Sequence, residues 1–330
     1  MTRGGFVFSS LGFVAAVAVA AVGALLLQPA QAAVGPVPPE ALALPGDASF
    51  VVGLDVKKLV ASSFYQRQGG ASAQSRLEAF KELHEKTGLD PEQDVSAIVL
   101  TGAQGAGAQT PSGAAVILGT FDEVKVKEAA ERRPGIRLGR HEGVALYSYG
   151  EGDSARSFAF LGRGALVLGQ DRIVRATLDN RSGGKTGLAS NASLVALLQR
   201  VKPGATFWMV GDQSVLQGLP KGVPGSGAGA SGGSLTLPAL KQVVVSGDVE
   251  PQLALDATGD TADEAGAKSL ADMLRGLIGL LAMQAAQKPE LAGLASAFNV
   301  TQAGAQVTVT VRIPPELLDA LQKPSRPPAQ

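Results

Sequence analysis

The chain has 330 residues, with 29 basic and 29 acidic side chains, 42 glycines and no cysteine. Its balanced charge argues against partners that are recognised by a basic face, such as nucleic acid or an anionic membrane surface. The lack of cysteine excludes thiolate nucleophiles, thiolate metal sites and the cysteine-linked lipid anchor of exported lipoproteins.

Residues 1–32 have the three-part pattern of a secretory signal peptide. Arg3 is the only charge before an uncharged stretch from Phe6 to Leu27, and Ala30-Gln31-Ala32 forms a small-x-small cleavage site. We predict cleavage between Ala32 and Ala33, which places the mature protein in the periplasm or outside the cell. The uncharged stretch also reaches the roughly 20 residues that span a bilayer, so an uncleaved inner-membrane anchor is the alternative.

A Pro-rich connector (33–41) precedes a first half in which short β-rich runs alternate with helical patterns. In the helical patterns, apolar residues recur at spacings of three, and Gly88, Asp122 and Pro134 mark helix ends. The predicted elements are a strand over 49–56, a helix over 75–87, strands over 95–101 and 114–120, a helix over 123–133, strands over 144–149, 157–161 and 165–168, and a helix from 171 to 179.

The second half repeats the order of the first. Pro203-Gly204 leading to Phe207 and Asp212 matches Pro45-Gly46 leading to Phe50 and Asp55, and later strands and helices correspond as well. We therefore predict two tandem related copies, residues 42–199 and 200–322. Each is expected to be α+β, an antiparallel sheet with helices packed on one face, of the ferredoxin-like type.

Two segments have the composition of flexible chain. Residues 218–234 contain GSGAGASGG, which is typical of a random-coil linker inserted into the second copy. Residues 323–330 contain three prolines, which cannot donate a backbone hydrogen bond, so we expect a disordered tail.

The motifs that could carry chemistry are weak. Gly184-Lys185-Thr186 lacks the earlier glycine of a phosphate-binding loop and follows a helix rather than a strand, so a Gly-rich turn is the better interpretation. His84 and His141 have no metal-ligand spacing, and His84 fits a solvated helix face. Gly225-Ser226-Gly227 lies in the flexible insertion, where a serine nucleophile cannot be held in place.

Acidic residues offer the remaining candidates. Asp55 and Asp212 occupy equivalent places in the two halves and could form a paired carboxylate site, although helix capping explains each of them alone. Asp256, Asp260, Asp263 and Glu264 cluster in sequence but fit a strand and the acidic first turn of a helix better than a calcium loop. We therefore assign no catalytic, cofactor-binding or metal-binding residue.

A long helix is predicted from Asp263 to about Gln287. Leucine, isoleucine and methionine side chains recur in it at spacings of three and four, which predicts a stripe that packs in the core. Its uninterrupted apolar part, Gly276 to Met283, is too short to span a membrane, and an interaction face is the alternative to burial.

The signal pattern, the Pro-rich connector and LPGDASFVVGLDV (Leu44–Val56) with its later echo resemble a group of bacterial exported proteins known as a domain of unknown function. The resemblance implies an envelope location and a duplicated α+β body, and it supplies no catalytic residues. Gly211 stands where the pattern in the first half has Leu54, so the repeat is degenerate.

These observations favour an exported, non-enzymatic envelope protein that binds another protein or acts as a structural or accessory factor. The alternatives are a small-ligand-binding protein that uses the cleft between the two copies, and a membrane-anchored protein that keeps its leader. An enzyme with a dispersed carboxylate site is a third possibility, because such sites leave little trace in sequence.

Overall fold

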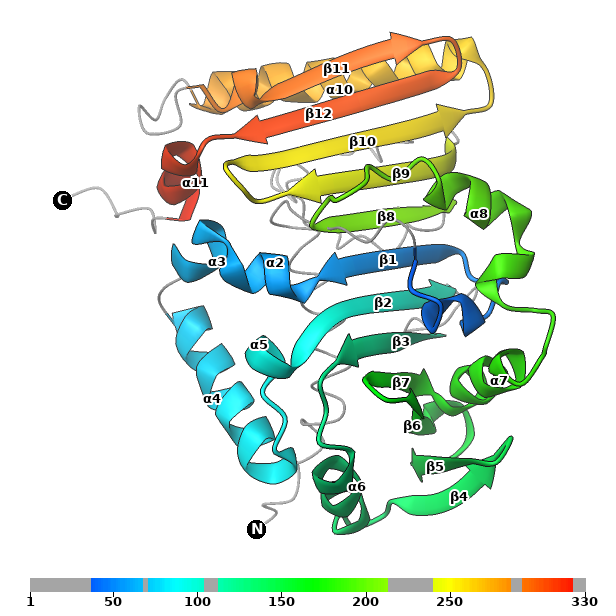
Figure 1. Cartoon of the computed structure of the whole chain (residues 1–330). Coiled ribbons are helices and arrows are strands. Elements are labelled where there is room, and N and C mark those ends of the chain that lie inside the picture. Colours follow the sequence, from blue (N-terminus) through cyan, green and yellow to red (C-terminus); the bar gives the residue numbers. More distant parts are fainter. Residues whose placement is uncertain (1–36, 68–70, 104–111, 213–239, 286–292, 323–330) are drawn as a thin grey trace, which may run out of the picture.

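The computed structural model describes residues 37–67, 71–103, 112–212, 240–285 and 293–322, which form a mixed α+β body around one antiparallel sheet (Figure 1). The strands are β1 (Phe50–Asp55), β2 (Val95–Ala103), β3 (Ser112–Gly119), β4 (Arg137–His141), β5 (Val144–Tyr149), β6 (Arg156–Gly162), β7 (Ala165–Gln170), β8 (Phe207–Asp212), β9 (Leu240–Asp248), β10 (Leu253–Thr261), β11 (Phe298–Ala303) and β12 (Gln306–Ile313). They form a 12-stranded sheet in the order β11-β12-β10-β9-β8-β1-β2-β3-β7-β6-β5-β4.

Helices connect the strands and cover them. The α-helices are α2 (Val56–Ala61), α3 (Ser63–Arg67), α4 (Ala71–Thr87), α5 (Pro91–Asp94), α6 (Glu123–Glu131), α7 (Asp171–Arg181), α8 (Ala192–Leu198), α10 (Glu264–Ala285) and α11 (Pro315–Gln322). Short 3-10 turns are η1 (Ala41–Ala43), η2 (Gly152–Ser154), η3 (Leu188–Ser190) and η5 (Ala295–Ala297). The strands expected over 49–56 and 144–149 and the helices expected over 75–87 and 123–133 are confirmed within a few residues.

The two halves of the chain meet at the centre of this sheet. β1 and β8 pair directly and antiparallel, with Gly53 opposite Trp208 and Leu54 opposite Phe207. Outward from this pair the first half runs β1-β2-β3-β7-β6 and the second β8-β9-β10-β12-β11, with β5 and β4 added beyond β6. The expectation that each half has a sheet of its own is therefore corrected, since both halves share one sheet.

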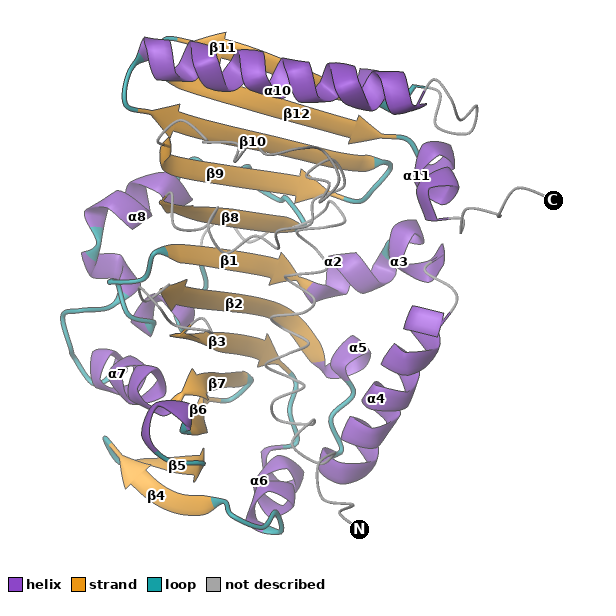
Figure 2. Cartoon of the chain, turned by 180° about the vertical axis from the view of Figure 1, so that it is seen from behind, coloured by secondary structure: helices purple, strands orange, loops and turns teal. Residues whose placement is uncertain are grey.

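The helices lie on both faces of the sheet, whereas we expected them on one. Figures 1 and 2 show α7 and α8 over one face and α10 over the other. The reason is visible in β6, where Phe158 and Phe160 point away from α7 while Ser157, the residue before Phe158, contacts Asp171 at the start of α7. Strands such as β6 and β7 are buried at consecutive positions, so both of their faces require cover.

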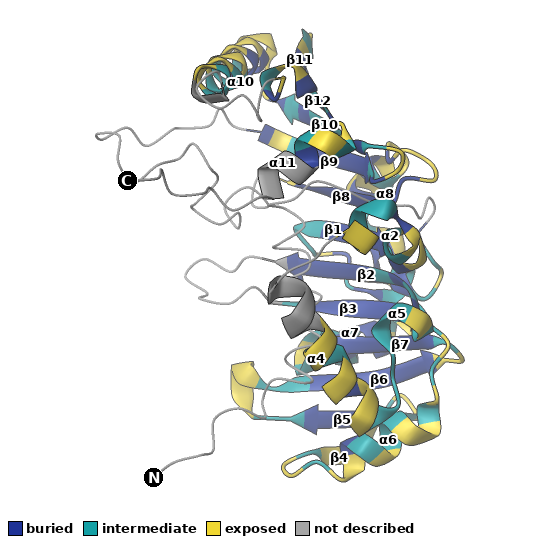
Figure 3. Ribbon diagram, turned by 90° about the vertical axis from the view of Figure 1, so that its left-hand side faces the viewer, coloured by how far each residue is buried: buried dark blue, intermediate teal, exposed yellow. Residues whose placement is uncertain are grey.

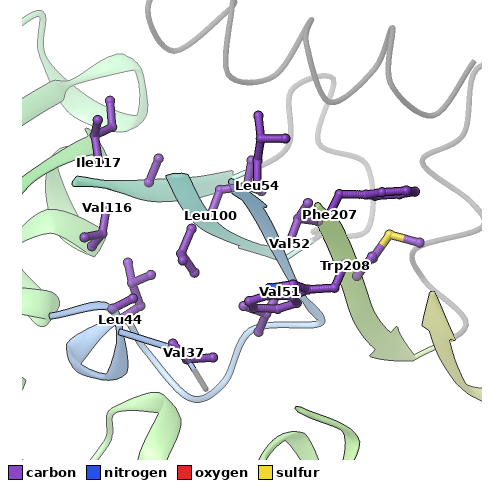
Figure 4. Packing of buried hydrophobic residues seen from close by; sticks show 14 of the residues in the cluster. Val37, Leu44, Val51, Val52, Leu54, Leu100, Val116, Ile117, Phe207 and Trp208 are labelled. Carbon is purple, nitrogen blue, oxygen red and sulfur yellow. The ribbon is translucent and has the colours of Figure 1, made fainter. Parts of the chain in front are cut away.

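The main hydrophobic core spans the centre of the sheet. Figure 4 shows Leu54 and Phe207 on one face of the central strands, and Val51 and Trp208 on the other, beside Leu44 of the segment that precedes β1. Trp208, Val51 and Leu44 are fully buried. Figure 3 shows the same pattern for the whole body, with buried strands at the centre and exposed residues on the outer sides of the helices.

The two outer edges of the sheet differ in chemistry. At one end, β4 carries Arg137 and Arg140, and both are exposed. At the other end, β11 has no charged residue, but Arg275 of α10 donates from Nη2 to the carbonyl of Val300 at 3.2 Å. Charged side chains therefore accompany both outer strands.

The contact between Gly53 and Trp208 predicts a strong effect of a single methyl group. A Cβ at residue 53 would lie 2.3 Å from the indole Cε2 of Trp208, and that ring is fully buried. Gly53→Ala should lower the free energy of unfolding by about 1–3 kcal/mol, measured by urea denaturation followed by far-ultraviolet circular dichroism.

Gly279→Ala is the matched control, because nothing lies within 4 Å of its Cβ position on α10. This substitution should leave the stability unchanged or raise it by about 0.5–1 kcal/mol through helix propensity. Equal stability changes in both variants would contradict the packing described for the central strand pair.

Candidate ligand cavity

A cavity of 450 Å³ lies between the sheet and the two helices α4 and α6. The floor comes from Ile117 of β3 and from alternate residues of β6 and β7, and the walls come from the end of α4 and one side of α6. Its lining residues are Leu83, Glu85, Lys86, Thr87, Leu89, Ile117, Phe121, Val126, Ala129, Ala130, Arg132, Arg133, Pro134, Phe158, Phe160, Leu166 and Leu168. Most of this surface is apolar, which suits a hydrophobic ligand.

Strand register explains why these floor residues share one face. Ile117 pairs with Leu166, and Leu166 pairs in turn with Phe160. Leu168 pairs with Phe158 in the same way. Directly paired residues of an antiparallel sheet point to the same side, so a continuous apolar patch faces α6.

Helix ends set the position of the walls. Asp122 accepts a hydrogen bond from the amide of Lys125 at 3.2 Å and so begins α6. Gly88 adopts φ +69° after α4, and its amide donates to the carbonyl of His84 at 2.7 Å, as expected for a glycine cap. A Cβ on Gly88 would lie 2.8 Å from Cδ of Lys125, so the glycine also permits the close approach of the two helices.

Aromatic rings continue from the cavity floor toward β5. Tyr147 stacks on Phe158 with ring centroids 4.7 Å apart, and Phe160 meets Phe158 edge to face at 6.3 Å. Nζ of Lys127 lies 4.9 Å from the centroid of the Phe160 ring. Burial, reinforced by the neighbouring Glu131 carboxylate, raises the pKa of Tyr147, so the phenol stays neutral at physiological pH.

A polar network occupies the opposite face of the same strands. Ser148 and Ser157 are buried, their hydroxyl oxygens lie 2.8 Å apart, and both donate to the carboxylate of Asp171. Arg175 donates from Nε to Oδ2 of Asp171 at 2.6 Å. Burial alone would raise the pKa of Asp171, but the bonds from Arg175, Ser157 and Ser148 outweigh it and hold the pKa below the ordinary value.

The order of groups in this network does not support nucleophilic catalysis. Nη1 of Arg175 lies 3.5 Å from Nδ1 of His141, and Nε2 of His141 lies 2.6 Å from Oδ1 of Asp179. Arg175 therefore separates the histidine from the serines, whereas a serine nucleophile needs a histidine within hydrogen-bond reach to take its proton. The network instead ties β5 and β6 to α7.

His141, Glu142 and Asp179 form the one group in the described part of the chain whose donor atoms lie close enough to hold a metal, all within 4.8 Å of one another. The Arg175 guanidinium beside the ring places a positive charge where it opposes a bound cation. The positive φ of Glu142 (48°) and of Gly143 (74°) belongs to the two-residue turn between β4 and β5. A hydrogen-bonded His–Asp pair accounts for these contacts.

The structure separates Asp55 and Asp212. The amide of Asp55 bonds to the carbonyl of Thr206, and that of Asp212 to the carbonyl of Ser49, which places the two acids at opposite ends of the β1–β8 pair. Asp55 accepts the amide of Lys58 at 2.9 Å and caps α2, as the capping interpretation predicts. The residues that follow Asp212 lie outside the described residues, so its capping role stays a prediction.

The acidic cluster of the second half is also dispersed. Asp256 pairs with Arg312, Asp260 pairs with Arg200, and Asp263 accepts the amide of Gly266 at 2.7 Å at the start of α10.

In the first half, the Lys185 and Thr186 segment is a turn after α7, where Thr186 bonds to Asn180. His84 is exposed on α4, as the helix-face interpretation predicts.

The long helix matches its predicted stripe only in part. Ala267, Leu270 and Ala271 of α10 are buried in a second hydrophobic cluster with strands β11 and β12, whereas Leu280 and Met283 near its end are 55% and 67% exposed.

Within the described ranges, no helix is both long enough and apolar enough to cross a bilayer. The leader, the 218–234 insertion with Gly225-Ser226-Gly227, and the 323–330 tail lie outside those ranges.

No protein-family profile matches this sequence, and no curated protein matches it either. The fold is similar to crystal structures of TP0453. Crystal form III gives a TM-score of 0.47 at 7% identity over 87% of this chain and 98% of that chain, and form I gives 0.45 at 9% identity over the same shares. At these values the likeness supports no inference about what the chain binds.

The Asp171 network predicts a pH-dependent loss of stability. The folded-state pKa of Asp171 is depressed, so its contribution is present above the ordinary value of 3.8 and is lost as the pH falls through the lower folded value. At neutral pH, Asp171→Asn should lower the free energy of unfolding by about 1–3 kcal/mol, measured by urea denaturation. The difference in the free energy of unfolding between Asp171→Asn and the unsubstituted chain should become smaller in acid.

Asp179→Asn is the control, because the Asp179 side chain is 52% exposed and its loss should cost only about 0–1 kcal/mol. A stability gap for Asp171→Asn that stays constant from neutral pH into acid would contradict a role for its charge.

Proposed function

We propose that this chain is an exported, non-enzymatic binding protein that holds an apolar small molecule in the cavity beneath α4 and α6. The observation that carries the proposal is the cavity itself. Its 450 Å³ fall within the roughly 300–1,000 Å³ typical of small-molecule sites. Its floor is built from the rigid sheet, and rigid elements hold a binding surface more precisely than loops do.

The chemistry of the cavity wall favours binding over catalysis. Its residues include no serine, cysteine, histidine, aspartate or tyrosine, and Glu85 is its single carboxylate. The hydroxyl of Thr87 already donates to the carbonyl of Leu83 at 2.7 Å and accepts from the amide of Leu89 at 3.2 Å. The wall residues therefore offer no nucleophile with a neighbouring base.

The proposed ligand site lies inside the first half, not between the halves. Our sequence-based alternative was a cleft between two copies, but the halves join through the paired strands β1 and β8. We infer that the halves are nevertheless two copies of one unit. The shared strand order, β1-β2-β3-β7-β6 against β8-β9-β10-β12-β11, supports this inference together with the repeated Pro-Gly, Phe and Asp residues.

Export is supported by the leader pattern alone. The uncharged stretch after Arg3 and the Ala30-Gln31-Ala32 site favour cleavage and release into the periplasm or the medium. A retained leader would instead tether the same binding body to the inner membrane, and mass spectrometry of the native N-terminus distinguishes the two products.

A protein-binding or accessory role is the second candidate, and α10 favours it. The segment from Gly276 to Met283 has no charged residue, and Leu280 and Met283 within it are more than half exposed. Adjacent exposed apolar side chains often mark a contact surface for another molecule. This candidate and the ligand cavity use different elements, so both can hold in one protein.

Filling the cavity should weaken ligand binding without unfolding the chain. Ala129→Trp places a large ring from α6 into the cavity, whereas Val124→Trp puts the same ring on the 65% exposed outer side of that helix. With the neutral fluorescent probe N-phenylnaphthylamine, Ala129→Trp should weaken binding by about tenfold or more, and Val124→Trp should not. Unchanged probe binding in Ala129→Trp, at an unchanged melting temperature, would overturn the proposed site.

The second candidate predicts a position-specific contact at the end of α10. A photo-cross-linking amino acid at Leu280 should form a discrete protein adduct in the envelope of the native host. The same group at Lys268, which is exposed near the start of the helix, should form none. The adduct is detected by immunoblotting, and equal labelling at both positions would argue against a specific surface on α10.

A further inference from the structure

The charged residues of the cavity wall point to a more specific ligand, and this inference rests on the proposed function. Four charged residues line the cavity: Glu85, Lys86, Arg132 and Arg133. Three of them are cations, although the chain as a whole is balanced. Lys127, whose ammonium group lies over the Phe160 ring of the floor, adds a fourth cation beside the cavity.

Two of these cations, Lys86 and Arg132, have partners that are exposed and easily exchanged. Lys86 pairs with Glu82, and Arg132 pairs with Glu128 at 3.3 Å, each four residues earlier on the same helix and with both side chains at least 45% exposed. Such surface pairs contribute only about 0–1 kcal/mol, so a ligand carboxylate can replace one at little cost. Glu85 is itself close to Lys81, at 3.8 Å.

Two adjacent arginines suit a carboxylate better than a single lysine does. The guanidinium group is planar and presents two parallel N–H donors to the two oxygens of a carboxylate. The Arg133 guanidinium lies 5.6 Å from the centroid of the Tyr149 ring, which packs against the group. Arg132 follows the last residue of α6, and its side chain is 67% exposed.

The rest of the wall selects against polar groups within the ligand. Its uncharged polar side chain, Thr87, has both of its hydrogen bonds satisfied within the chain. The remaining lining residues are leucine, isoleucine, valine, alanine, proline and phenylalanine. A polar group in the middle of a ligand would therefore lose its water without gaining a partner, which is costly.

We propose that the cavity binds an unbranched aliphatic chain with a terminal carboxylate, with the chain on the Phe158–Phe160 floor and the carboxylate at Arg132 and Arg133. The volume of 450 Å³ falls in the lower part of the range for small-molecule sites, which suits a chain of medium length. The occupant is thus a free fatty acid rather than a neutral lipid.

A role in helix capping is the competing explanation for the same cations. Lys86 lies in the last turn of α4 and Arg132 follows α6, where positive charge complements the helix dipole. This explanation predicts that stability depends on the cations but that the cavity does not distinguish charged from neutral ligands. Ligand preference therefore separates the two explanations.

The test compares dodecanoate with dodecanol as competitors of N-phenylnaphthylamine on the purified chain. The two ligands share one chain and differ in the charge of the head group. Dodecanoate should displace the probe at a concentration about tenfold lower than dodecanol. The double variant Arg132→Gln/Arg133→Gln should lose this preference while its affinity for dodecanol stays unchanged.

The charge-matched control is Arg163→Gln/Lys185→Gln, which removes two exposed cations that do not line the cavity. This control should keep the preference for dodecanoate. Equal displacement by both ligands in the unsubstituted chain, or equal weakening of both in Arg132→Gln/Arg133→Gln, would overturn the carboxylate proposal and leave the apolar site intact. If neither ligand displaces the probe, and Ala129→Trp leaves probe binding unchanged, the proposed function itself fails.

Discussion

The close approach of Gly53 and Trp208 at the centre of the sheet is the constraint on which the rest of the structure depends. β1 and β8 can pair only if the indole ring fits against a strand residue without a side chain, and glycine at residue 53 provides that space. Once these strands pair, a single surface extends across both halves of the chain. The fully buried ring belongs to the same hydrophobic core as Leu44 of the segment that precedes β1.

A shared sheet also explains why the two faces of β5, β6 and β7 differ in character. Because side chains alternate along a strand, Phe158 and Phe160 point to the α6 side of the sheet and Ser157 points to the α7 side. The apolar side is left with a cavity because short side chains such as Ala129 and Ala130 face it. The polar side is filled by the salt-bridged Asp171 and Arg175, which hold α7 firmly in place. One face thus contains the cavity, and the other contains the hydrogen-bonded network of Ser148, Ser157, Asp171 and Arg175.

Sequence patterns predicted the individual elements better than their assembly. Gly88 and Asp122 mark helix ends through local backbone chemistry, and such signals need no knowledge of the fold. β4 was missed because Arg137–His141 is exposed at four of its five positions and has neither an apolar run nor an alternating pattern. The pairing of β1 with β8 was missed for a different reason, since hydrophobic patterns do not say which strands become neighbours.

The candidate cavity could not be predicted for a similar reason. Its residues come from 83–89, 117–134 and 158–168, and no short motif joins them. The alternation of Phe158, Phe160, Leu166 and Leu168 was visible, but it indicates a core face as readily as a ligand site. His141 and Asp179 are 38 residues apart, and only the packing of α7 on the β4–β5 hairpin brings them together. The space beneath α6 is a property of packing, not of any single segment.

The edges of the sheet have a further consequence for contacts between molecules of this protein. The halves of this chain join by pairing one strand edge to another, and the same chemistry could in principle continue from molecule to molecule into a fibre. The bond from Arg275 to the carbonyl of Val300 occupies an acceptor on β11, and the arginines of β4 make the opposite end unfavourable for a like-charged neighbour. Charged side chains at sheet edges are a common protection against pairing with another chain, and these arginines place such charge at both ends of the sheet.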